Sequence, residues 1–116
     1  MKYTCLVYFE EKIWEEMSES SALNLSEESM RYDQDLQSSG HYIAAEALES
    51  VHAATTVRMR NGKLSVSDGP FSETKEVLGG FILIDAVDLN EAIKIASKIP
   101  LARVGTVEVR PVLTRA

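Results

Sequence analysis

Residues 80–86 read Gly-Phe-Ile-Leu-Ile-Asp-Ala, the most apolar run in this chain of 116 residues. A strand over this run would be apolar on both faces, which is typical of a central strand covered on both sides. Residues 2–9 show the same pattern, because Leu6 and Tyr8 make the second face partly apolar as well. The sequence therefore predicts a sheet built around two central strands.

A long helix is expected over residues 27–39. Ser26 is a candidate N-cap with acidic residues behind it, which complement the partial positive charge of a helix start. Gly40 follows the helix and tolerates the left-handed conformation of a C-terminal cap. Before this helix, residues 10–19 are charged around a few apolar side chains that include Trp14, and they predict a further turn or two of helix.

A second helix is expected to begin at the capping box formed by Asp88 and Glu91 and to run to about Ile99. Asn61-Gly62 has the residues of a type I′ turn and predicts a β-hairpin. The strands expected besides the two central ones cover residues 41–48, 54–60, 63–67 and 106–113.

Without the hairpin, the elements follow the order strand, helix, strand, strand, helix, strand. This order predicts one α+β domain over residues 1–116, with a ferredoxin-like (split βαβ) antiparallel sheet, two main helices on one face and an inserted β-hairpin. Two helices cover only one face of such a sheet. Since the central strands are apolar on both faces, we expect a second copy to cover the other face in a symmetric homodimer.

The composition limits the binding partners and the cellular compartment that we expect for this protein. A net charge of −6 and a pI near 4.9 disfavour direct contact with nucleic acid or an anionic membrane. The chain starts directly in a strand pattern without the features of a signal peptide, so we expect a cytoplasmic protein. Cys5 alternates with apolar neighbours and is interpreted as a small buried hydrophobe. No cofactor or metal site is expected.

The loop over residues 67–76 is the segment least explained by packing. Asp68, Gly69, Pro70 and Phe71 combine a turn-forming carboxylate, a flexible glycine, a rigid proline and an apolar anchor, so they hold one carboxylate on a stiff loop. Asp68 is therefore a candidate catalytic or orienting group. The alternative is that Asp68 only closes an Asx-turn while Phe71 fills the core.

Other side chains are candidates for the same site. His41 is either a strand-entry residue or the titratable partner of Asp68, whereas His52 is interpreted as a solvated loop residue. A metal site would need the loop to fold over the strand so that His41, Glu46 and Asp68 meet. Lys75 either contacts an anionic ligand or belongs to a solvated, self-paired surface with Glu73 and Glu76. The mixed face of the first long helix presents Ser29 and Tyr32 toward the cleft.

Several segments together resemble the DGPF-domain proteins of the YCII-related family. The resembling segments are Met1–Tyr3, Thr55–Arg58, Asp68–Glu76, Leu78–Phe81, Ile99–Pro100 and Val107–Val112. The resemblance implies a ferredoxin-like domain that pairs into a dimeric α+β barrel, with a cleft between helix, sheet and partner.

The resemblance also bears on function. Some YCII-related proteins resemble acid–base enzymes with a His and an Asp on and after the first long helix, but Ser29 and Ser38 stand at those two places here. Other DGPF relatives occur beside sigma factors, which implies regulation or ligand sensing.

Three functions remain open at this point. The first is a small-molecule binding or sensing dimer with its cleft at the loop from Asp68 to Phe71. The second is an enzyme that uses Asp68 as an acid, base or orienting group, with His41, Tyr32 or Ser29 in the cleft. The third is a protein-interaction dimer associated with a sigma factor.

Overall fold

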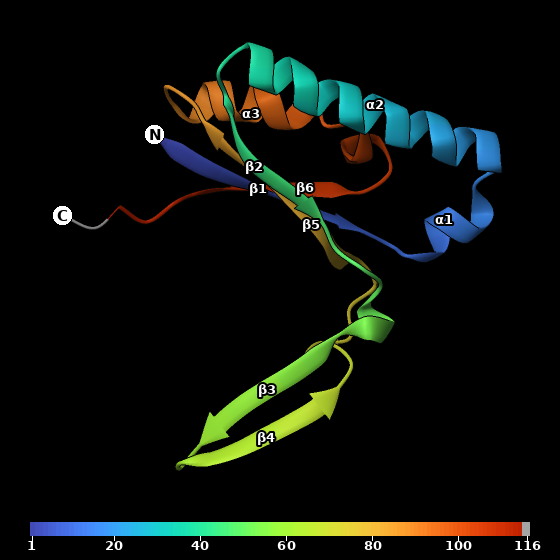
Figure 1. Ribbon diagram of the computed structural model, residues 1–116, viewed down its shortest axis with the longest axis vertical. Helices are drawn as coiled ribbons and strands as arrows, with labels where there is room; N and C mark the ends of the chain where they lie inside the picture. Colours follow the sequence, from blue (N-terminus) through green and yellow to red (C-terminus); the bar gives the residue numbers. More distant parts are fainter. Residues whose placement is uncertain (115–116) are drawn as a thin grey trace.

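The computed structural model describes residues 1–114 and shows an α+β domain from which a β-hairpin projects (Figure 1). Its helices are α1 (Lys12–Glu16), α2 (Glu19–Ser38) and α3 (Leu89–Ser97). Its strands are β1 (Lys2–Phe9), β2 (Tyr42–Ala47), β3 (Thr55–Arg60), β4 (Lys63–Asp68), β5 (Val77–Asp85) and β6 (Thr106–Pro111). Two short 3₁₀ segments lie at Val51–Ala53 and Pro100–Arg103.

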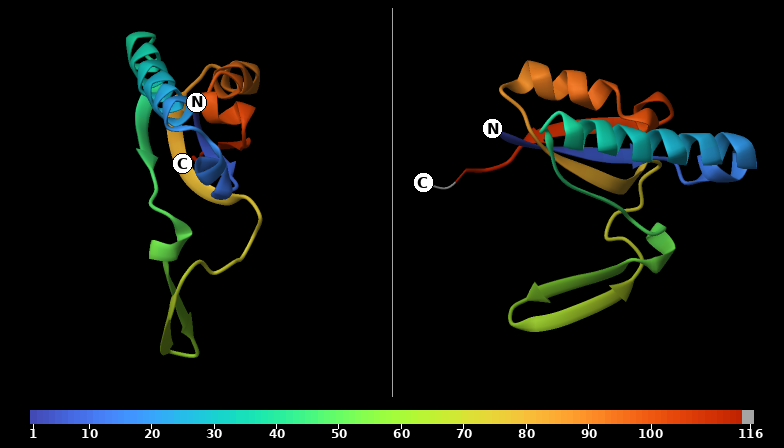
Figure 2. Two further views of the ribbon diagram at one scale, coloured as in Figure 1. Left: turned by 90° about the vertical axis from the view of Figure 1, so that its right-hand side faces the viewer. Right: turned by 45° about the horizontal axis from the view of Figure 1, so that its top comes forward.

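The main sheet has the strand order β2-β5-β1-β6, and all neighbouring strands are antiparallel. α2 and α3 both lie on one face of this sheet (Figure 2). The arrangement is compatible with the predicted ferredoxin-like fold. β1 and β5 are the two central strands, as their apolar sequences predict.

The core lies between this sheet and the two helices. Tyr3, Cys5, Val7 and Phe9 alternate along β1, and each is at most 8% exposed on the helix side of the sheet. Cys5 is fully buried, and burial raises the pKa of its thiol to about 11. The interpretation of Cys5 as a small buried hydrophobe is therefore confirmed, because a protonated, inaccessible thiol is a poor nucleophile.

The first long helix begins eight residues earlier than predicted. The N-cap of α2 is Ser18, whose Oγ accepts a hydrogen bond from the Ser21 amide at 3.1 Å, and Ser26 is an exposed residue inside the helix. The predicted cap at Ser26 was wrong because the serine-rich segment before it contains an equally good cap. The C-terminal prediction holds, since Gly40 has a φ of 81°.

The capping box of α3 is present in a shifted form. The Asp88 side chain accepts from the Glu91 amide at 2.9 Å, as predicted. The Glu91 carboxylate reaches back to the amide of Val87 at 3.0 Å instead of the Asp88 amide. The Glu91 amide is one that the helix itself leaves unpaired, and the second bond ties the Glu91 carboxylate to the residue before the cap, so Glu91 is held in a fixed position at the start of α3.

β3 and β4 pair only with each other, in a separate two-stranded sheet. Asn61 and Gly62 in the turn between them have φ values of 53° and 75°, as a type I′ turn requires. We call residues 55–68 the arm. The arm leaves the body of the molecule, and the radius of gyration is 16.2 Å, compared with about 13 Å for a compact chain of this length.

Gly79 is required where β1 and β5 change register. The pairing shifts between Val7 and Tyr8, so that Gly79 is the extra residue on β5. A Cβ atom at Gly79 would overlap the ring of Phe9, which packs edge-on against Trp14 with ring centroids 5.7 Å apart. A side chain at this position would therefore displace the Phe9 ring.

We predict that Gly79→Ala lowers the free energy of unfolding by about 1–3 kcal/mol, the usual cost of overpacking a core. Urea denaturation measures this loss. In a Phe9→Leu background, where the ring is absent, Gly79→Ala should cost clearly less. Equal costs in the two backgrounds would contradict the proposed overlap.

Candidate functional site

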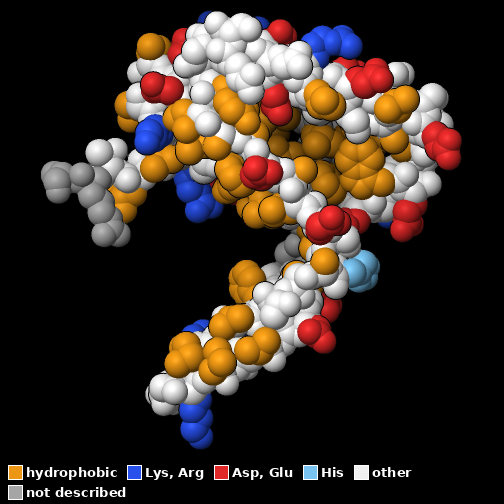
Figure 3. All heavy atoms as spheres, in the orientation of Figure 1, with side chains coloured by type: hydrophobic (Ala, Val, Ile, Leu, Met, Phe, Trp, Pro, Cys, Tyr) orange, Lys and Arg blue, Asp and Glu red, His pale blue; other side chains and the backbone are white. Residues whose placement is uncertain are grey.

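A cavity of about 190 Å³ opens between α2 and the strands β2 and β5. We call it the α2 cleft. Figure 3 shows a hollow with hydrophobic side chains at its base on this face of the molecule. The apolar lining residues on the helix side of the sheet are Val7, Ala45, Ala47, Ile82, Ile99, Pro100 and Leu101. The helix contributes three polar side chains, Ser29, Tyr32 and Asp33.

Glycines on β5 form part of the cleft wall. A Cβ atom at Gly80 would lie 2.8 Å from the carbonyl oxygen of Glu46 on β2, which is closer than real Cβ contacts. Gly80 thus permits the close approach of the two strands beneath α2.

The hydroxyl groups of Ser29 and Tyr32 are both engaged as donors. The Ser29 hydroxyl donates to the Leu25 carbonyl at 2.9 Å, within the helix. The Tyr32 hydroxyl donates to the Ile95 carbonyl at 2.7 Å and so ties α2 to α3. Burial is the main cause that raises the pKa of Tyr32 to about 12, so this hydroxyl stays neutral. Each oxygen keeps free lone pairs and can still accept a hydrogen bond.

Asp33 is the third polar residue that α2 contributes to the cleft, which Glu46 of β2 also lines, and no sequence pattern singles Asp33 out. Its carboxylate is half-buried, and we find no hydrogen-bond or ion-pair partner for it within residues 1–114. Burial raises the pKa of Asp33 above its ordinary value, because an apolar environment disfavours the charged form. A partly desolvated carboxyl in a cavity is typical of ligand-binding and catalytic sites.

The loop that follows β4 is clamped to β3 at its start. The Gly69 amide donates to the Ala54 carbonyl at 2.7 Å, and the Thr56 hydroxyl donates to the Gly69 carbonyl at 2.7 Å. Gly69 has a φ of 93°, the left-handed conformation that glycine was expected to provide. The beginning of the loop is therefore stiff, as its sequence indicates.

Asp68 is exposed and borders a second cavity of about 430 Å³ together with His52, Gly69, Pro70 and Glu73. Within the described residues, its carboxylate makes no hydrogen bond to the loop amides, so the Asx-turn interpretation lacks support. Phe71 is 78% exposed. The alternative in which Phe71 fills the core is therefore wrong, because the loop turns its ring away from the body.

Lys75 and Glu76 attach the end of this loop to the body. The Lys75 Nζ lies 3.3 Å from the Glu10 Oε1. Glu76 is half-buried, and its Oε1 has no hydrogen-bond partner among the described residues. The expected solvated, self-paired surface is therefore only partly right, since Lys75 pairs outside the loop and Glu76 is not fully solvated.

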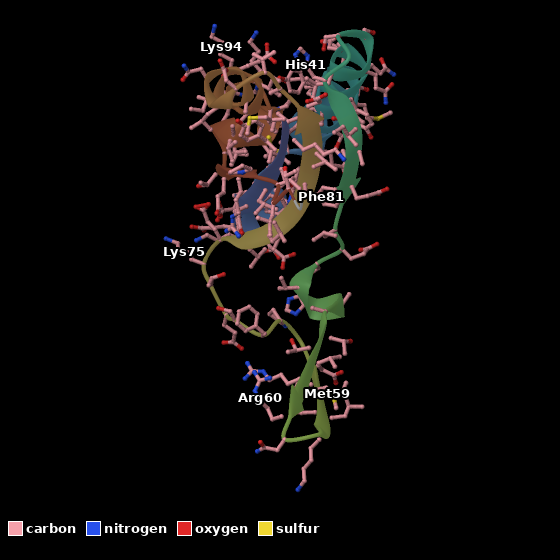
Figure 4. The ribbon with its side chains drawn as sticks, turned by 90° about the vertical axis from the view of Figure 1, so that its left-hand side faces the viewer. His41, Met59, Arg60, Lys75, Phe81 and Lys94 are labelled. Atoms are coloured by element: carbon pink, nitrogen blue, oxygen red, sulfur yellow. The ribbon has the colours of Figure 1, made fainter. Side chains whose placement is uncertain are left out.

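The His41 ring forms hydrogen bonds with residues other than Asp68, the partner that the sequence suggested. Its Nδ1 lies 2.7 Å from the Ser39 Oγ, and its Nε2 lies 3.2 Å from the Glu91 Oε1. Figure 4 shows His41 at the far end of the body from Lys75 and the arm. The structure does not bring His41 and Asp68 together within one chain, because the length of β2 separates them.

His41 instead joins the end of α2 to the start of α3, since Glu91 also caps α3. The metal set of His41, Glu46 and Asp68 is not assembled either. Within residues 1–114, no group of three or more His, Cys, Asp or Glu side chains is placed to hold a metal ion.

The fold and the cleft define a small α+β domain with a cavity between a helix and the sheet. The model of the YCII-related domain matches residues 1–115, and the chain belongs to the YCII-related family. Over 61 residues the chain is 49% identical to the uncharacterized protein R00369 of Rhizobium meliloti (strain 1021). This match covers 51% of the chain and 49% of the relative, so it spans about half of each protein.

None of the helices that the structure describes has the length and apolar character needed to cross a membrane.

We predict that Asp33→Asn stabilises the protein at neutral pH. Burial raises the pKa of Asp33 in the folded state above its unfolded value of about 3.9, so stability falls as the pH rises from about 4 through the folded pKa. At pH 7 the ionised carboxylate is less favourable in the cleft than in water, and the neutral amide removes this cost. Urea denaturation at pH 7 and at about pH 3 measures the difference.

The gain from Asp33→Asn should vanish at about pH 3, where the carboxyl is protonated in both states. Asp35→Asn on the exposed side of α2 is the matched control, because it removes the same charge from the same helix. An equal gain from both variants would assign the effect to the overall charge of α2.

Proposed function

We propose that this protein is a small-molecule binding dimer whose ligand is a small amine with an apolar body, held in the α2 cleft. The observation that carries this proposal is the unpartnered, half-buried carboxylate of Asp33 in an otherwise largely apolar cavity. Charged groups are stable in such places when an opposite charge and hydrogen-bond donors accompany them.

The polar groups of the cleft favour a ligand that donates hydrogen bonds. The hydroxyl groups of Ser29 and Tyr32 already donate to the carbonyl oxygens of Leu25 and Ile95. Toward a ligand, their oxygens can therefore act only as acceptors. Ionised Asp33 is an acceptor as well. A cationic amine satisfies these groups, and the net charge of −6 favours its approach over that of an anion.

The size of the α2 cleft limits the apolar part of the ligand. A cavity of about 150 Å³ lined by apolar side chains can hold benzene, and the α2 cleft measures about 190 Å³. A single ring or a short branched chain with one amino group therefore fits. The α2 cleft is favoured over the cavity at the loop from Asp68 to Phe71, because Asp33 is half-buried whereas Asp68 is exposed.

The dimer in this proposal uses the sheet face that carries no helix. We call it the open face. Leu6, Tyr8, Phe81 and Leu83 point to this side from β1 and β5 and are only half-buried. An antiparallel sheet with apolar residues on both faces needs a second cover, and a second copy of the chain supplies an identical apolar face.

Calorimetric titration with benzylamine tests the site, with benzoate as the compound of opposite charge. We expect benzylamine to bind and benzoate not to bind. Asp33→Asn should weaken benzylamine binding about tenfold or more, because it removes a charge-assisted hydrogen bond. Asp35→Asn should leave the affinity within about twofold. Preference for benzoate, or equal affinities in the two variants, would contradict the proposal.

An enzyme that uses the same cleft is the second candidate. The raised pKa of Asp33 favours it, because burial makes this carboxyl a better proton acceptor than an ordinary aspartate. If a bound amine is converted, the rate should follow the titration of Asp33 and be lost in Asp33→Asn. Stoichiometric release of unchanged amine identifies a binding protein instead.

A further inference from the structure

One face of the arm carries four apolar side chains that the rest of the described chain leaves exposed, and the Thr55–Asp68 pair lies on the same side where the arm joins the body. Val57 stands opposite Val66 and Met59 opposite Leu64, so the four side chains lie on the same side of the two strands. Each of them is 57–64% exposed. The other side carries Arg58, Arg60, Lys63 and three serine or threonine residues. Figure 4 shows Met59 and Arg60 on opposite sides of the hairpin.

A hairpin of this kind needs a cover. A two-stranded sheet alone is at best marginally stable in water, and it becomes stable when its apolar face packs against other structure. None of the four apolar side chains belongs to the core cluster of the domain or packs against it. The apolar face of the arm is therefore a surface for another molecule.

The placement of the arm indicates which molecule covers its apolar face. The arm lies on the side of the main sheet opposite α2 and α3, which is the side of the open face (Figure 1). Figure 3 shows open space between the body and the arm. One chain thus presents two uncovered apolar surfaces, the open face and the arm, with open space between them.

Charge supports a second copy as the occupant. The arm carries three basic residues and one acidic residue in a chain whose net charge is −6, so arm and body attract each other between copies. In a twofold dimer, whatever the arm of one copy contacts on its partner is repeated in the other direction. Both arms are then covered by the same contact.

We propose that the β3–β4 arm of each subunit reaches across the dimer and packs its apolar face on the body of the partner. The proposal rests on the dimer of the proposed function and adds the arm to its interface. It does not depend on the amine site, so benzylamine binding by the monomer or dimer can succeed or fail independently.

The test places two aspartates on one side or the other of β4. Leu64→Asp/Val66→Asp puts them on the apolar face, and Ser65→Asp/Ser67→Asp puts the same charges on the polar face of the same strand. Sedimentation equilibrium of the full chain gives the dimer Kd of each protein. We expect the first variant to raise the Kd about thirtyfold or more, as loss of central apolar contacts does. The second should change it by less than about fivefold.

A cysteine at position 64 reports the arm contact directly. In Leu64→Cys, the new thiol should react with a disulfide reagent much more slowly above the dimer Kd than below it, while Cys5 stays buried at both concentrations. A wild-type protein that is monomeric at 100 µM, equal effects of the two aspartate pairs, or a thiol at position 64 that reacts equally fast at both concentrations would each overturn the proposal. In the last case the arm would be free to bind a different protein.

Discussion

The pairing of β1 with β5 is the constraint on which the rest of the structure depends. Its register places Cys5 beside Ile82 on one side and Leu6 beside Phe81 on the other. The two helices of the chain occupy only the side of Cys5, where they complete the core. The side of Leu6 is left half-buried, and the arm projects on that same side. One strand pair thus produces both a closed core and an open, apolar surface.

The α2 cleft follows from the same pairing. Gly79 takes up the register shift beneath Phe9, and Gly80 lets β2 approach β5. The hydrogen bond from Tyr32 to Ile95 fixes α2 over this point of the sheet. Asp33, the next residue on the helix, is thereby held against an apolar wall at a cost to stability. Proteins commonly retain such destabilised groups where they serve binding or catalysis.

Much of the fold could be predicted from local patterns. Residues 2–9 form the predicted strand because alternation along a strand is visible in sequence. α3 begins at Asp88 because a capping box is a local signal. The start of α2 was missed because several serines precede Ser26 and each can cap a helix, so only the packing of the helix decides among them.

The candidate site depended on contacts that local patterns do not contain. Asp33 looks like an ordinary surface acid of α2, but it lines a cavity together with Pro100 and Leu101 from the other end of the chain. The sequence suggested His41 as a titratable partner of Asp68, but the His41 ring is hydrogen-bonded to Glu91, which lies 50 residues away in sequence. The sequence of residues 67–76 correctly predicts a stiff loop, but it does not predict that the Phe71 side chain is exposed to solvent.

The titration of Asp33 itself tests the central claim most directly. Carbon-detected NMR of the side-chain carboxyls across pH 3–8 follows each acid, and the spectrum of Asp33→Asn assigns the signal of interest. We predict a midpoint above the ordinary aspartate value of about 3.9, and a fall in that midpoint when benzylamine is added, because a bound cation stabilises the carboxylate. A midpoint at or below the ordinary value would show a well-solvated surface acid, and the α2 cleft would then lose its functional group.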